Sequence, residues 1–329
     1  MNILTRYRET LLQKLDEILR GGPPSSPVLD MCRYHVGLAE ADGSPRSAGV
    51  GKMVRPALCL AMYEALATEG DPWETCVPAA LAIELVHRTS LIFDDIQDNS
   101  PQRNHRPTVW TTWGVNQALN GGLALSCYAR LALSGLAHGY VETHRLLEKA
   151  VIELCRGQYM DIEFQGRMPT LDEYLEMVRL KTGVLMGTAC EVGAVVAGAE
   201  SKREEAAILG QRMGVAFQLQ DDCLDIWGRP EDLGKPQGDV GERKRSLPVV
   251  LAMEEHPDTV PQMLEDPQGA EKLLTLLRDS PSIEARATYQ VRSAGSGALK
   301  SLDALVAGLD RPWVEAFREM VGFMITRAS

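Results

Sequence analysis

The sequence of 329 residues predicts an all-α protein, and three observations support this prediction. Apolar residues recur at intervals of three and four over most of the chain, which is the spacing of one face of a helix. The sequence contains no convincing run of alternating apolar and polar residues, the pattern typical of strands. No low-complexity linker divides it. We therefore expect one domain over residues 1–329.

The first predicted helices alternate with segments rich in glycine and proline. A helix over residues 1–19 has one apolar face, and GGPPSSP at 21–27 ends it. Residues 41–51 are loop-like, and the helical spacing returns over 52–68. The stretch 79–93 is apolar nearly all round, which predicts a helix buried on most sides.

The middle of the chain continues as helices with a loop at 99–107. Helical patterns cover 111–138 and 143–165. Two capping boxes then mark helix starts, Thr170-Leu-Asp-Glu173 and Ser201-Lys-Arg-Glu204. We expect the helices that they open to end near Ala199 and Trp227.

The most apolar long stretch, 183–199, contains Glu191 and is too short to span a membrane comfortably, so it is interpreted as a buried helix. Residues 228–246 form a charged loop. The remainder is expected to form shorter helices, broken at four prolines: Pro257, Pro267, Pro281 and Pro312.

Composition and charge exclude several classes of protein. The sequence is 45% hydrophobic and 24% charged, which is typical of a globular protein, and its formal net charge is −11. This charge argues against nucleic acid or an anionic membrane as a partner. Seven cysteines without a CxxC pair fit neither a zinc site nor a disulfide framework. The charged N-terminal segment is no signal peptide, so we expect a cytoplasmic protein without stable membrane insertion.

Two segments repeat one carboxylate pattern, DDIQD at 94–98 and DDCLD at 221–225. On a helix, residues i and i+4 share a face, so each segment projects two carboxylates together and holds a third beside them. Both segments lie near the C-terminal end of a predicted helix, where the helix dipole opposes negative charge by about 0.3–1 kcal/mol per charge.

A single segment of this kind is typical of a solvated acidic helix end. The runs LAIELVHRTSLIF and MGVAFQLQ before the two motifs are, however, too apolar for surface helices. Carboxylates at the mouth of a buried helix need protonation, basic partners or a metal. Oxygen ligands suit Mg²⁺, which commonly bridges to substrate phosphates. The two motifs together therefore favour a phosphate-binding Mg²⁺ site.

Basic residues cluster around the same loops: Lys52, Arg55, Arg103, Lys181, Lys235 and Lys244. Their six positive charges balance the six aspartates, so bound Mg²⁺ leaves room for several phosphate charges. A single basic residue is usually a solvated side chain. Lys181 differs because it lies on an otherwise apolar helix and needs a partner there.

These motifs resemble those of the trans-isoprenyl diphosphate synthases (polyprenyl synthetases), in particular short-chain members of the geranylgeranyl diphosphate synthase type. Matching landmarks run from GKMVRP at 51–56 to RKRSLP at 243–248, about two thirds of the chain. HRPTVW, GQYMDIEF, KTG and both aspartate motifs lie between them. The resemblance implies the isoprenoid synthase fold, a large helical bundle around a central cavity, and a homodimer.

The resemblance also implies a reaction of isoprenoid biosynthesis. A prenyltransferase would condense isopentenyl diphosphate with an allylic prenyl diphosphate, both small-molecule partners, and make a longer trans-prenyl diphosphate. Mg²⁺ would be the cofactor. Its implied ligands are the six aspartates Asp94, Asp95, Asp98, Asp221, Asp222 and Asp225.

Further roles follow residue by residue from the same resemblance. Arg103, Lys181, Lys235 and Lys244 match positions that contact the allylic diphosphate. Lys52, Arg55 and His87 match positions that bind isopentenyl diphosphate. Thr182 and Gln218 match positions that line the reacting ends of the substrates. The implied catalytic set is Lys181, Thr182, Gln218 and Lys235.

The sequence departs from the family after the first motif. Asn104 stands where a second arginine usually binds isopentenyl diphosphate, and a neutral amide provides no bidentate cationic grip. Phe93 stands where many members have histidine. One interpretation is drift in an active enzyme, with Arg106 or His105 compensating. The other is weakened use of isopentenyl diphosphate.

The second interpretation leads to an alternative function. A relative without that substrate would ionise and cyclise one longer prenyl diphosphate, as class I terpene synthases do. Because Lys52, Arg55 and His87 are retained, chain elongation is favoured. A third possibility is a non-catalytic partner subunit of another synthase, a role that would not require both aspartate motifs.

Product length is predicted from the turn before the first motif. In the family, bulky residues at these positions form the floor of the product tunnel, whereas Thr89 and Ser90 are small. We therefore expect a product of twenty carbons or longer rather than fifteen, and favour geranylgeranyl diphosphate. Tyr128 on a neighbouring helix either blocks the tunnel further down or packs in the core.

Overall fold

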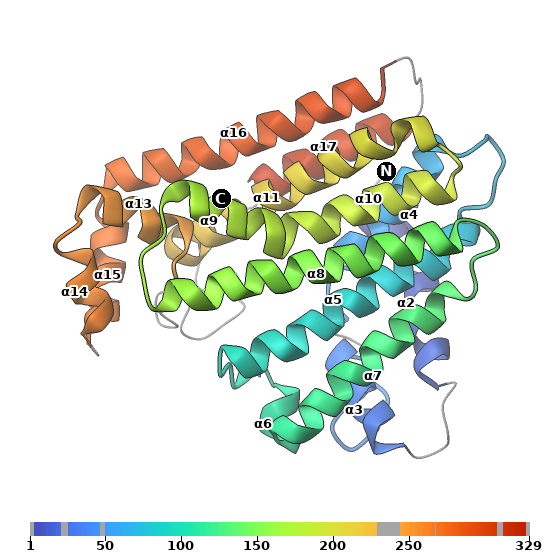
Figure 1. Cartoon of the computed structure of the whole chain (residues 1–329), viewed down its shortest axis with the longest axis horizontal. Coiled ribbons are helices and arrows are strands. Elements are labelled where there is room, and N and C mark those ends of the chain that lie inside the picture. Colours follow the sequence, from blue (N-terminus) through green and yellow to red (C-terminus); the bar gives the residue numbers. More distant parts are fainter. Residues whose placement is uncertain are drawn as a thin grey trace. The chain divides into compact units, whose positions relative to one another are not determined.

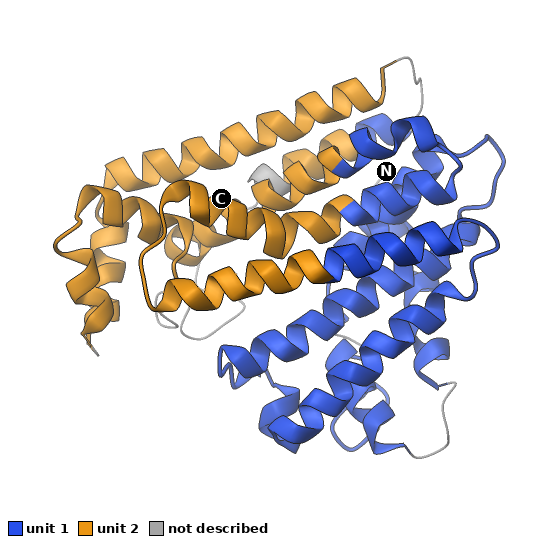
Figure 2. Cartoon of the chain, in the orientation of Figure 1, with its two compact units in different colours: residues 1–151, 188–207, 309–316 blue, residues 152–187, 208–308, 317–329 orange. Residues whose placement is uncertain are grey.

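A computed structural model describes residues 3–20, 26–46, 50–228, 244–266, 268–307 and 312–326. These residues are helical apart from loops, one short hairpin and an isolated bridge between Ala39 and Pro45, which confirms the predicted all-α class. Contacts group the chain into two compact units (Figure 2). Each unit combines stretches that are distant in sequence, which explains why no linker marks a boundary. The prediction of one domain stays a prediction.

Unit 1 comprises residues 1–151, 188–207 and 309–316. Its first elements are α1 (Ile3–Arg6), α2 (Arg8–Arg20), α3 (Pro27–Val36), α4 (Val54–Leu66), the 3₁₀ turn η1 (Trp73–Cys76), α5 (Val77–Gln97), β1 (Gln102–Arg103), β2 (Arg106–Pro107), α6 (Val109–Trp113) and α7 (Val115–Leu133), shown in Figure 1. It also takes the 3₁₀ turn η3 (Glu200–Lys202) and parts of α8 (Tyr140–Gln165), α10 (Val184–Val196) and α11 (Arg203–Trp227).

Helix α5 forms the centre of unit 1. It packs along α7 and against α4 (Figure 1), and most of its residues from Val77 to Val86 are buried. The helical segment Trp73–Gln97 has the length and composition of a membrane span, but 67% of its most apolar window is buried inside the fold, as in a core helix. The predicted buried helix within 183–199 is confirmed as α10, most of whose residues are buried.

Tyr7, between α1 and α2, joins the start of the chain to two distant segments. Its side chain is buried, and its hydroxyl donates to Oε2 of Glu64 at 2.5 Å. Its ring packs edge-on against Trp73 and stacks on Trp313, with centroids 5.1 and 6.4 Å away. Residues from both ends of the chain thus meet in unit 1.

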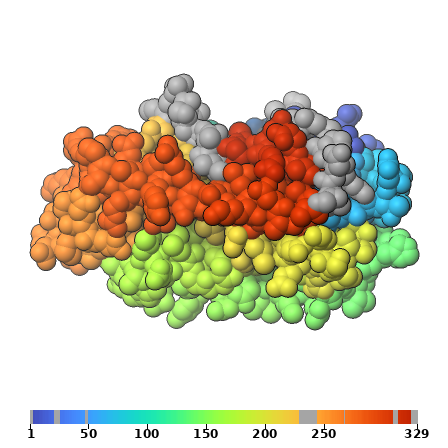
Figure 3. All heavy atoms as spheres, turned by 90° about the horizontal axis from the view of Figure 1, so that it is seen from above, coloured from blue at the N-terminus to red at the C-terminus, as the bar shows by residue number. Residues whose placement is uncertain are grey.

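Unit 2 comprises residues 152–187, 208–308 and 317–329. It contains α9 (Leu171–Val178), the π-helical turn η2 (Arg179–Gly183), α13 (Leu247–Glu255), α14 (Val260–Glu265), α15 (Gly269–Arg278) and α16 (Pro281–Leu305), with the remaining parts of α8, α10 and α11 and most of α17 (Pro312–Thr326). The orange atoms in Figure 3 are the exposed surface of α14 to α16. Phe164, Tyr174 and Leu247 belong to one buried apolar cluster of this unit.

The predicted helix starts are confirmed in part. Thr170 caps α9 through a complete capping box with Glu173. The second prediction is wrong, because Ser201 lies inside the 3₁₀ turn η3 and α11 begins only at Arg203. The predicted loop at 228–246 falls mostly outside the described residues.

The C-terminal segment was expected to form short helices, and this is wrong for α16, which has 25 residues. Pro281 begins α16 and Pro312 begins α17, so both prolines lie at breaks between consecutive helices, as predicted. Proline fits the first turn of a helix because its missing N–H has no intrahelical partner there.

Candidate active site

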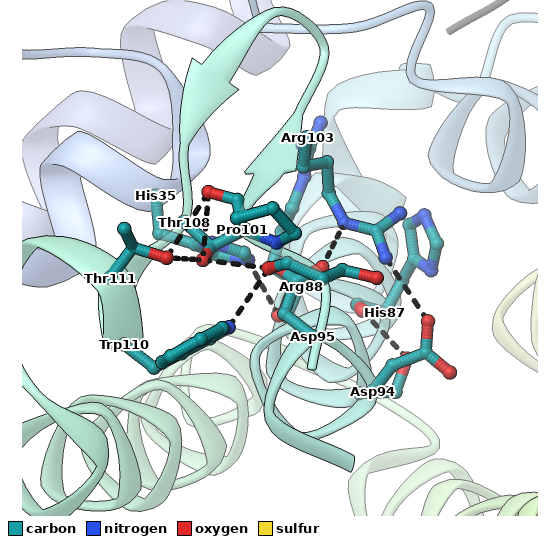
Figure 4. A network of polar contacts seen from close by, with 12 residues as sticks. His35, His87, Arg88, Asp94, Asp95, Pro101, Arg103, Thr108, Trp110 and Thr111 are labelled. Carbon is teal, nitrogen blue, oxygen red and sulfur yellow. Dashed lines mark hydrogen bonds and ion pairs between the residues drawn. The ribbon is translucent and has the colours of Figure 1, made fainter. Parts of the chain in front are cut away.

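The first aspartate motif lies at the end of α5, with Asp98 as the C-terminal cap, as predicted. Asp95 is buried, and Asp94 is mostly buried. Arg103 on β1 binds both, with its Nε 2.8 Å from Oδ1 of Asp95 and its Nη2 3.1 Å from Oδ2 of Asp94 (Figure 4). Burial works against the charge of Arg103, but the two carboxylates outweigh it and raise the pKa of the guanidinium.

A β-hairpin holds Arg103 in this place. Residues 102–103 pair antiparallel with 106–107, and Asn104 and His105 form the turn with φ angles of 51° and 60°. Two-residue turns of this hand need positive φ, and asparagine tolerates it better than arginine does. The residue at 104 therefore suits the turn.

Contacts below the hairpin fix its base. The Thr108 hydroxyl and the Trp110 indole both donate to the carbonyl of Ser100, at 3.0 and 2.9 Å (Figure 4). Arg106 donates to the carbonyls of Tyr34 and Ala39, at 3.2 and 3.1 Å. Arg106 therefore holds the hairpin against α3 and the residues that follow it, and its compensation for the missing arginine stays a prediction.

The residues matched to isopentenyl diphosphate binding come together at α4 and α5. Lys52 is exposed just before α4, and Arg55 lies in its first turn. Nη1 of Arg55 donates to Nε2 of His87 at 3.1 Å. Burial, and then Arg55, holds the pKa of His87 well below its usual value, so the ring is neutral and accepts this hydrogen bond.

The residues before the first motif have small or packed side chains. Thr89 and Ser90 are half-buried, and their hydroxyls donate to the carbonyls of Leu85 and His87, at 2.9 and 2.8 Å. The Phe93 ring rests on α7, where a Cβ added to Gly122 would lie 2.8 Å from its Cζ. Tyr128, also on α7, is half-buried.

Unit 2 holds the lysine predicted to need a partner. Lys181 lies in the π-helical turn η2, and its Nζ is 2.5 Å from Oδ2 of Asp161 on α8. The turn is packed closely on α8, because a Cβ at Gly157 would lie 2.6 Å from the backbone nitrogen of Lys181. Only glycine allows this approach, so Gly157 permits the irregular turn that presents Lys181.

A hydrogen-bonded chain starts at the next residue. The buried Thr182 hydroxyl donates to Oε1 of Gln218 at 3.0 Å, and Nε2 of Gln218 donates to Oδ1 of Asp222 at 2.8 Å. Oδ2 of Asp222 accepts from the backbone N–H of Leu247 at 2.8 Å and from the Tyr174 hydroxyl. The amide of Gln218 is thus fixed in one orientation.

The second aspartate motif lies in the last two turns of α11, again at a C-terminal end as predicted. Asp222 is buried among its hydrogen-bond donors, whereas Asp221 and Asp225 are half-buried. Lys244 is half-buried just before α13, and Lys235 lies outside the described residues. The first motif belongs to unit 1 and the second to unit 2, so their facing each other stays a prediction.

The donor chemistry of the motifs fits Mg²⁺. Asp94 and Asp98, like Asp221 and Asp225, are four residues apart on a helix and offer only oxygen ligands. In the part of the chain that the structure describes, no three His, Cys, Asp or Glu side chains already form a metal cage. A Mg²⁺ ion that takes waters and substrate phosphates as ligands needs no such cage.

The structure adds residues that the sequence reasoning missed. Asp161 binds Lys181, Tyr174 binds Asp222, and Glu84 pairs with Arg88 inside α5. Only the last pair had a local signal, a glutamate and an arginine at i and i+4 within an apolar run. The other two contacts join separate helices and leave no trace in the local pattern.

Comparisons with known proteins agree with these landmarks. A family model described as polyprenyl synthetase matches residues 46–277. The (2E,6E)-farnesyl diphosphate synthase of Mycobacterium tuberculosis H37Rv is 42% identical over 244 residues, which cover 73% of this chain and 66% of that protein, just under two thirds of its length. The geranylgeranyl diphosphate synthase of the same organism is 37% identical over 276 residues, covering 82% and 76%.

Two solved structures share the fold over nearly the whole chain. The polyprenyl synthetase of Streptomyces coelicolor A3(2) has a TM-score of 0.86 at 32% identity and covers 98% of each chain. The geranylgeranyl pyrophosphate synthetase of Geoglobus acetivorans has a TM-score of 0.81 at 30% identity, covering 99% of this chain and 98% of the other. The predicted isoprenoid synthase fold is thereby confirmed.

Proposed function

The chain belongs to the polyprenyl synthetase family of prenyltransferases, and we propose that it condenses isopentenyl diphosphate with an allylic prenyl diphosphate in a Mg²⁺-dependent reaction. The observation that carries the proposal is the pair of aspartate motifs, each at the C-terminal end of its helix. A carboxylate there is disfavoured by the helix dipole, so the arrangement favours cations nearby, of which Arg103 supplies one at the first motif. Relatives named as farnesyl and geranylgeranyl diphosphate synthases support the reaction class.

In this reaction the C–O bond of the allylic diphosphate breaks, and diphosphate leaves with the electron pair. The double bond of isopentenyl diphosphate forms a C–C bond to the allylic carbon. A neighbouring carbon then loses a proton, which the released diphosphate accepts. Mg²⁺ held by Asp94, Asp98 and the second motif would stabilise charge on the leaving group.

The protein's own side chains supply the remaining electrostatic stabilisation of the leaving diphosphate and the reacting carbon. Arg103 and Lys181 are cations held beside carboxylates, ready to bind the leaving diphosphate. Thr182 and Gln218 present fixed dipoles to the reacting carbon, because their hydrogen bonds leave them one orientation. No nucleophilic side chain takes part.

A product assay tests the proposal. The protein is incubated with Mg²⁺ and geranyl or farnesyl diphosphate, with and without isopentenyl diphosphate. Longer prenyl diphosphates that form only when isopentenyl diphosphate is present support elongation. Hydrocarbons or alcohols formed without it contradict elongation and favour the cyclising alternative that Asn104 suggests. Inactivity that another synthase relieves would point to a non-catalytic subunit.

The proposed product has twenty carbons. Thr89 and Ser90 fold their hydroxyls back onto the α5 backbone, so neither side chain extends from the helix as a bulky floor would. The relatives named for fifteen and twenty carbons leave both lengths open. Thr89→Phe should shorten the product, whereas Ser293→Phe on the exposed face of α16 serves as a control without effect. An unaltered product profile for Thr89→Phe contradicts the proposal.

The proposed assembly is a homodimer through α7. Four large aliphatic side chains on this helix are 43 to 63% exposed: Val115, Leu119, Leu123 and Leu131. Val115, Leu119 and Leu123 are spaced by four residues and share one face, and such a stripe favours a protein partner. Leu123→Glu should convert the dimer to a monomer in light scattering. An unchanged mass excludes this face.

The proposed location is the cytoplasm. All seven cysteines are free thiols, and five of them are buried. Free thiols persist in reducing compartments. Fractionation of cells that express the tagged chain tests the location, and recovery outside the cytoplasm contradicts it.

A further inference from the structure

The backbone that leads into α4 has an uncommon conformation. Gly51 and Met53 have φ angles of 57° and 51°, on either side of Lys52. A residue with a Cβ, such as Met53, rarely adopts positive φ, so contacts from outside must hold the segment in place.

Two guanidinium groups from different helices hold consecutive carbonyls of this segment. Arg88 on α5 donates from Nη2 to the carbonyl of Val50 at 3.2 Å. Arg8 on α2 donates from Nη1 to the carbonyl of Gly51 at 2.5 Å. The fit is close, because a Cβ at Gly51 would lie 3.1 Å from Nη2 of Arg88.

Arg88 is itself fixed within the core. It is 7% exposed, and its Nε donates to Oε1 of Glu84, which is 1% exposed, at 2.7 Å. A buried carboxylate needs a cation beside it, and a guanidinium fork can bind Glu84 and a carbonyl together. The residue before it, His87, accepts from Arg55. Two neighbouring residues of α5 thus hold both sides of the segment that carries Lys52 and Arg55.

We propose that Arg88 is a positioning residue that, with Arg8, sets the affinity for isopentenyl diphosphate by holding Lys52. The inference rests on the proposed function, in which Lys52 and Arg55 bind that diphosphate. Asn104 supports the inference: because its side chain is neutral, the positive charges that bind this diphosphate come from Lys52 before α4 and Arg55 within it. A displaced lysine would weaken that grip without changing any group at the reacting carbon.

Two variants separate positioning from simple core stability. Arg88→Lys keeps a counter-ion for Glu84, but a single ammonium does not reproduce the fork that also reaches Val50. Arg8→Gln removes the hydrogen bond to the carbonyl of Gly51. Because Arg8 is half-buried, this substitution should disturb folding less than one in the core. Arg20→Gln is the matched control, because Arg20 lies on the same helix as Arg8 in an exposed ion pair with Asp16.

The experiment measures binding of isopentenyl diphosphate to the full chain by titration calorimetry, and then steady-state kinetics. We expect each test variant to lose affinity about tenfold, with kcat and the KM for the allylic diphosphate within about twofold of wild type. Arg20→Gln should match wild type. Unchanged affinity in both test variants, or equal losses for both substrates, overturns the proposal.

The readout also separates this inference from the proposed function. Calorimetric binding requires no turnover, so a wild-type protein that binds isopentenyl diphosphate but elongates nothing contradicts the proposed function alone. A wild-type protein that elongates normally while both variants keep full affinity contradicts the positioning role alone.

Discussion

Arg103 places its Nε 2.8 Å from Oδ1 of Asp95, so the most buried carboxylate of the first aspartate motif is neutralised from within the chain. A buried charge whose partner is removed costs far more than the pair contributes when intact. Arg103 therefore has a structural role in the metal-free protein besides its predicted contact with the allylic diphosphate.

Arg103→Gln should lower the free energy of unfolding by about 3 kcal/mol, because Asp95 loses its counter-ion. Millimolar Mg²⁺ should raise the Tm of this variant more than that of wild type, since the metal replaces the lost positive charge. Differential scanning calorimetry with and without Mg²⁺ measures both effects. Arg156→Gln, which breaks an exposed pair with Glu153, is the control. Equal responses to Mg²⁺ would contradict the prediction.

The second motif should show a division of labour between neighbouring aspartates. Asp222→Asn should destabilise the protein by about 2 kcal/mol, because the carboxylate accepts hydrogen bonds from Gln218, Leu247 and Tyr174. Asp221→Asn should leave stability within about 0.5 kcal/mol and nearly abolish turnover. Urea unfolding and the product assay distinguish the two. Similar stability losses for both variants would contradict the prediction that Asp222 stabilises the fold and Asp221 does not.

Acid should destabilise unit 1 through His35. Burial, and then Arg88 and Arg103, lowers the pKa of His35 to about 3, and its ring donates to the carbonyl of Arg88 at 2.8 Å. The unfolded chain, with an ordinary histidine pKa of about 6.5, binds the extra proton first. Stability is therefore retained above pH 6.5 and lost as the pH falls from there towards 3.

The expected slope is about 1.4 kcal/mol per pH unit for each such histidine below pH 6.5. Urea unfolding between pH 7.5 and 5 measures it. His35→Gln keeps a donor for Arg88 but does not titrate, so its slope should be smaller by that amount. Identical slopes for the variant and wild type would show that His35 does not carry the effect.

The close approach at Gly157 should make this position intolerant of any side chain. Gly157→Ala should cost about 2 kcal/mol of stability and lower kcat at least about tenfold, because the added Cβ displaces the turn that carries Lys181. Gly297→Ala is the control, since its Cβ would meet only the Arg212 side chain at 3.8 Å. A Gly157→Ala enzyme with normal kcat would contradict the role of the π-helical turn.

Asn104→Arg tests whether the missing arginine matters. The φ angle of 51° at this position should make arginine cost about 1 kcal/mol of stability, while its charge should lower the KM for isopentenyl diphosphate. Asn104→Gly suits the same φ without adding charge and should leave this KM unchanged. Both are read from steady-state kinetics and thermal unfolding. An unchanged KM in the arginine variant would show that Asn104 is sequence drift without effect on the use of isopentenyl diphosphate.

The features predicted from the sequence are those set by local spacing. Helical periodicity gave the all-α class, and the capping box at Thr170 gave one helix start. The same signature failed at Ser201, where the chain first makes a 3₁₀ turn. The hairpin at 102–107 was not predicted, because its strands have two residues each and no alternating pattern forms.

The site was predictable as a set of residue types and not as a set of contacts. The need of Lys181 for a partner followed from its apolar surroundings, but Asp161 lies 20 residues away on another helix. The sequence shows Asn104 only as a lost charge, whereas its backbone conformation gives a second reason for asparagine. Such reasons depend on tertiary structure, which residue spacing does not encode.

The stacking of Tyr7 on Trp313 has a consequence for biosynthesis. Unit 1 includes residues 309–316, so it is incomplete until the ribosome has translated that segment. Unit 2 likewise draws on residues 317–329. Neither unit can therefore finish folding before these segments are translated, and apolar helices such as α5 are exposed to aggregation until then.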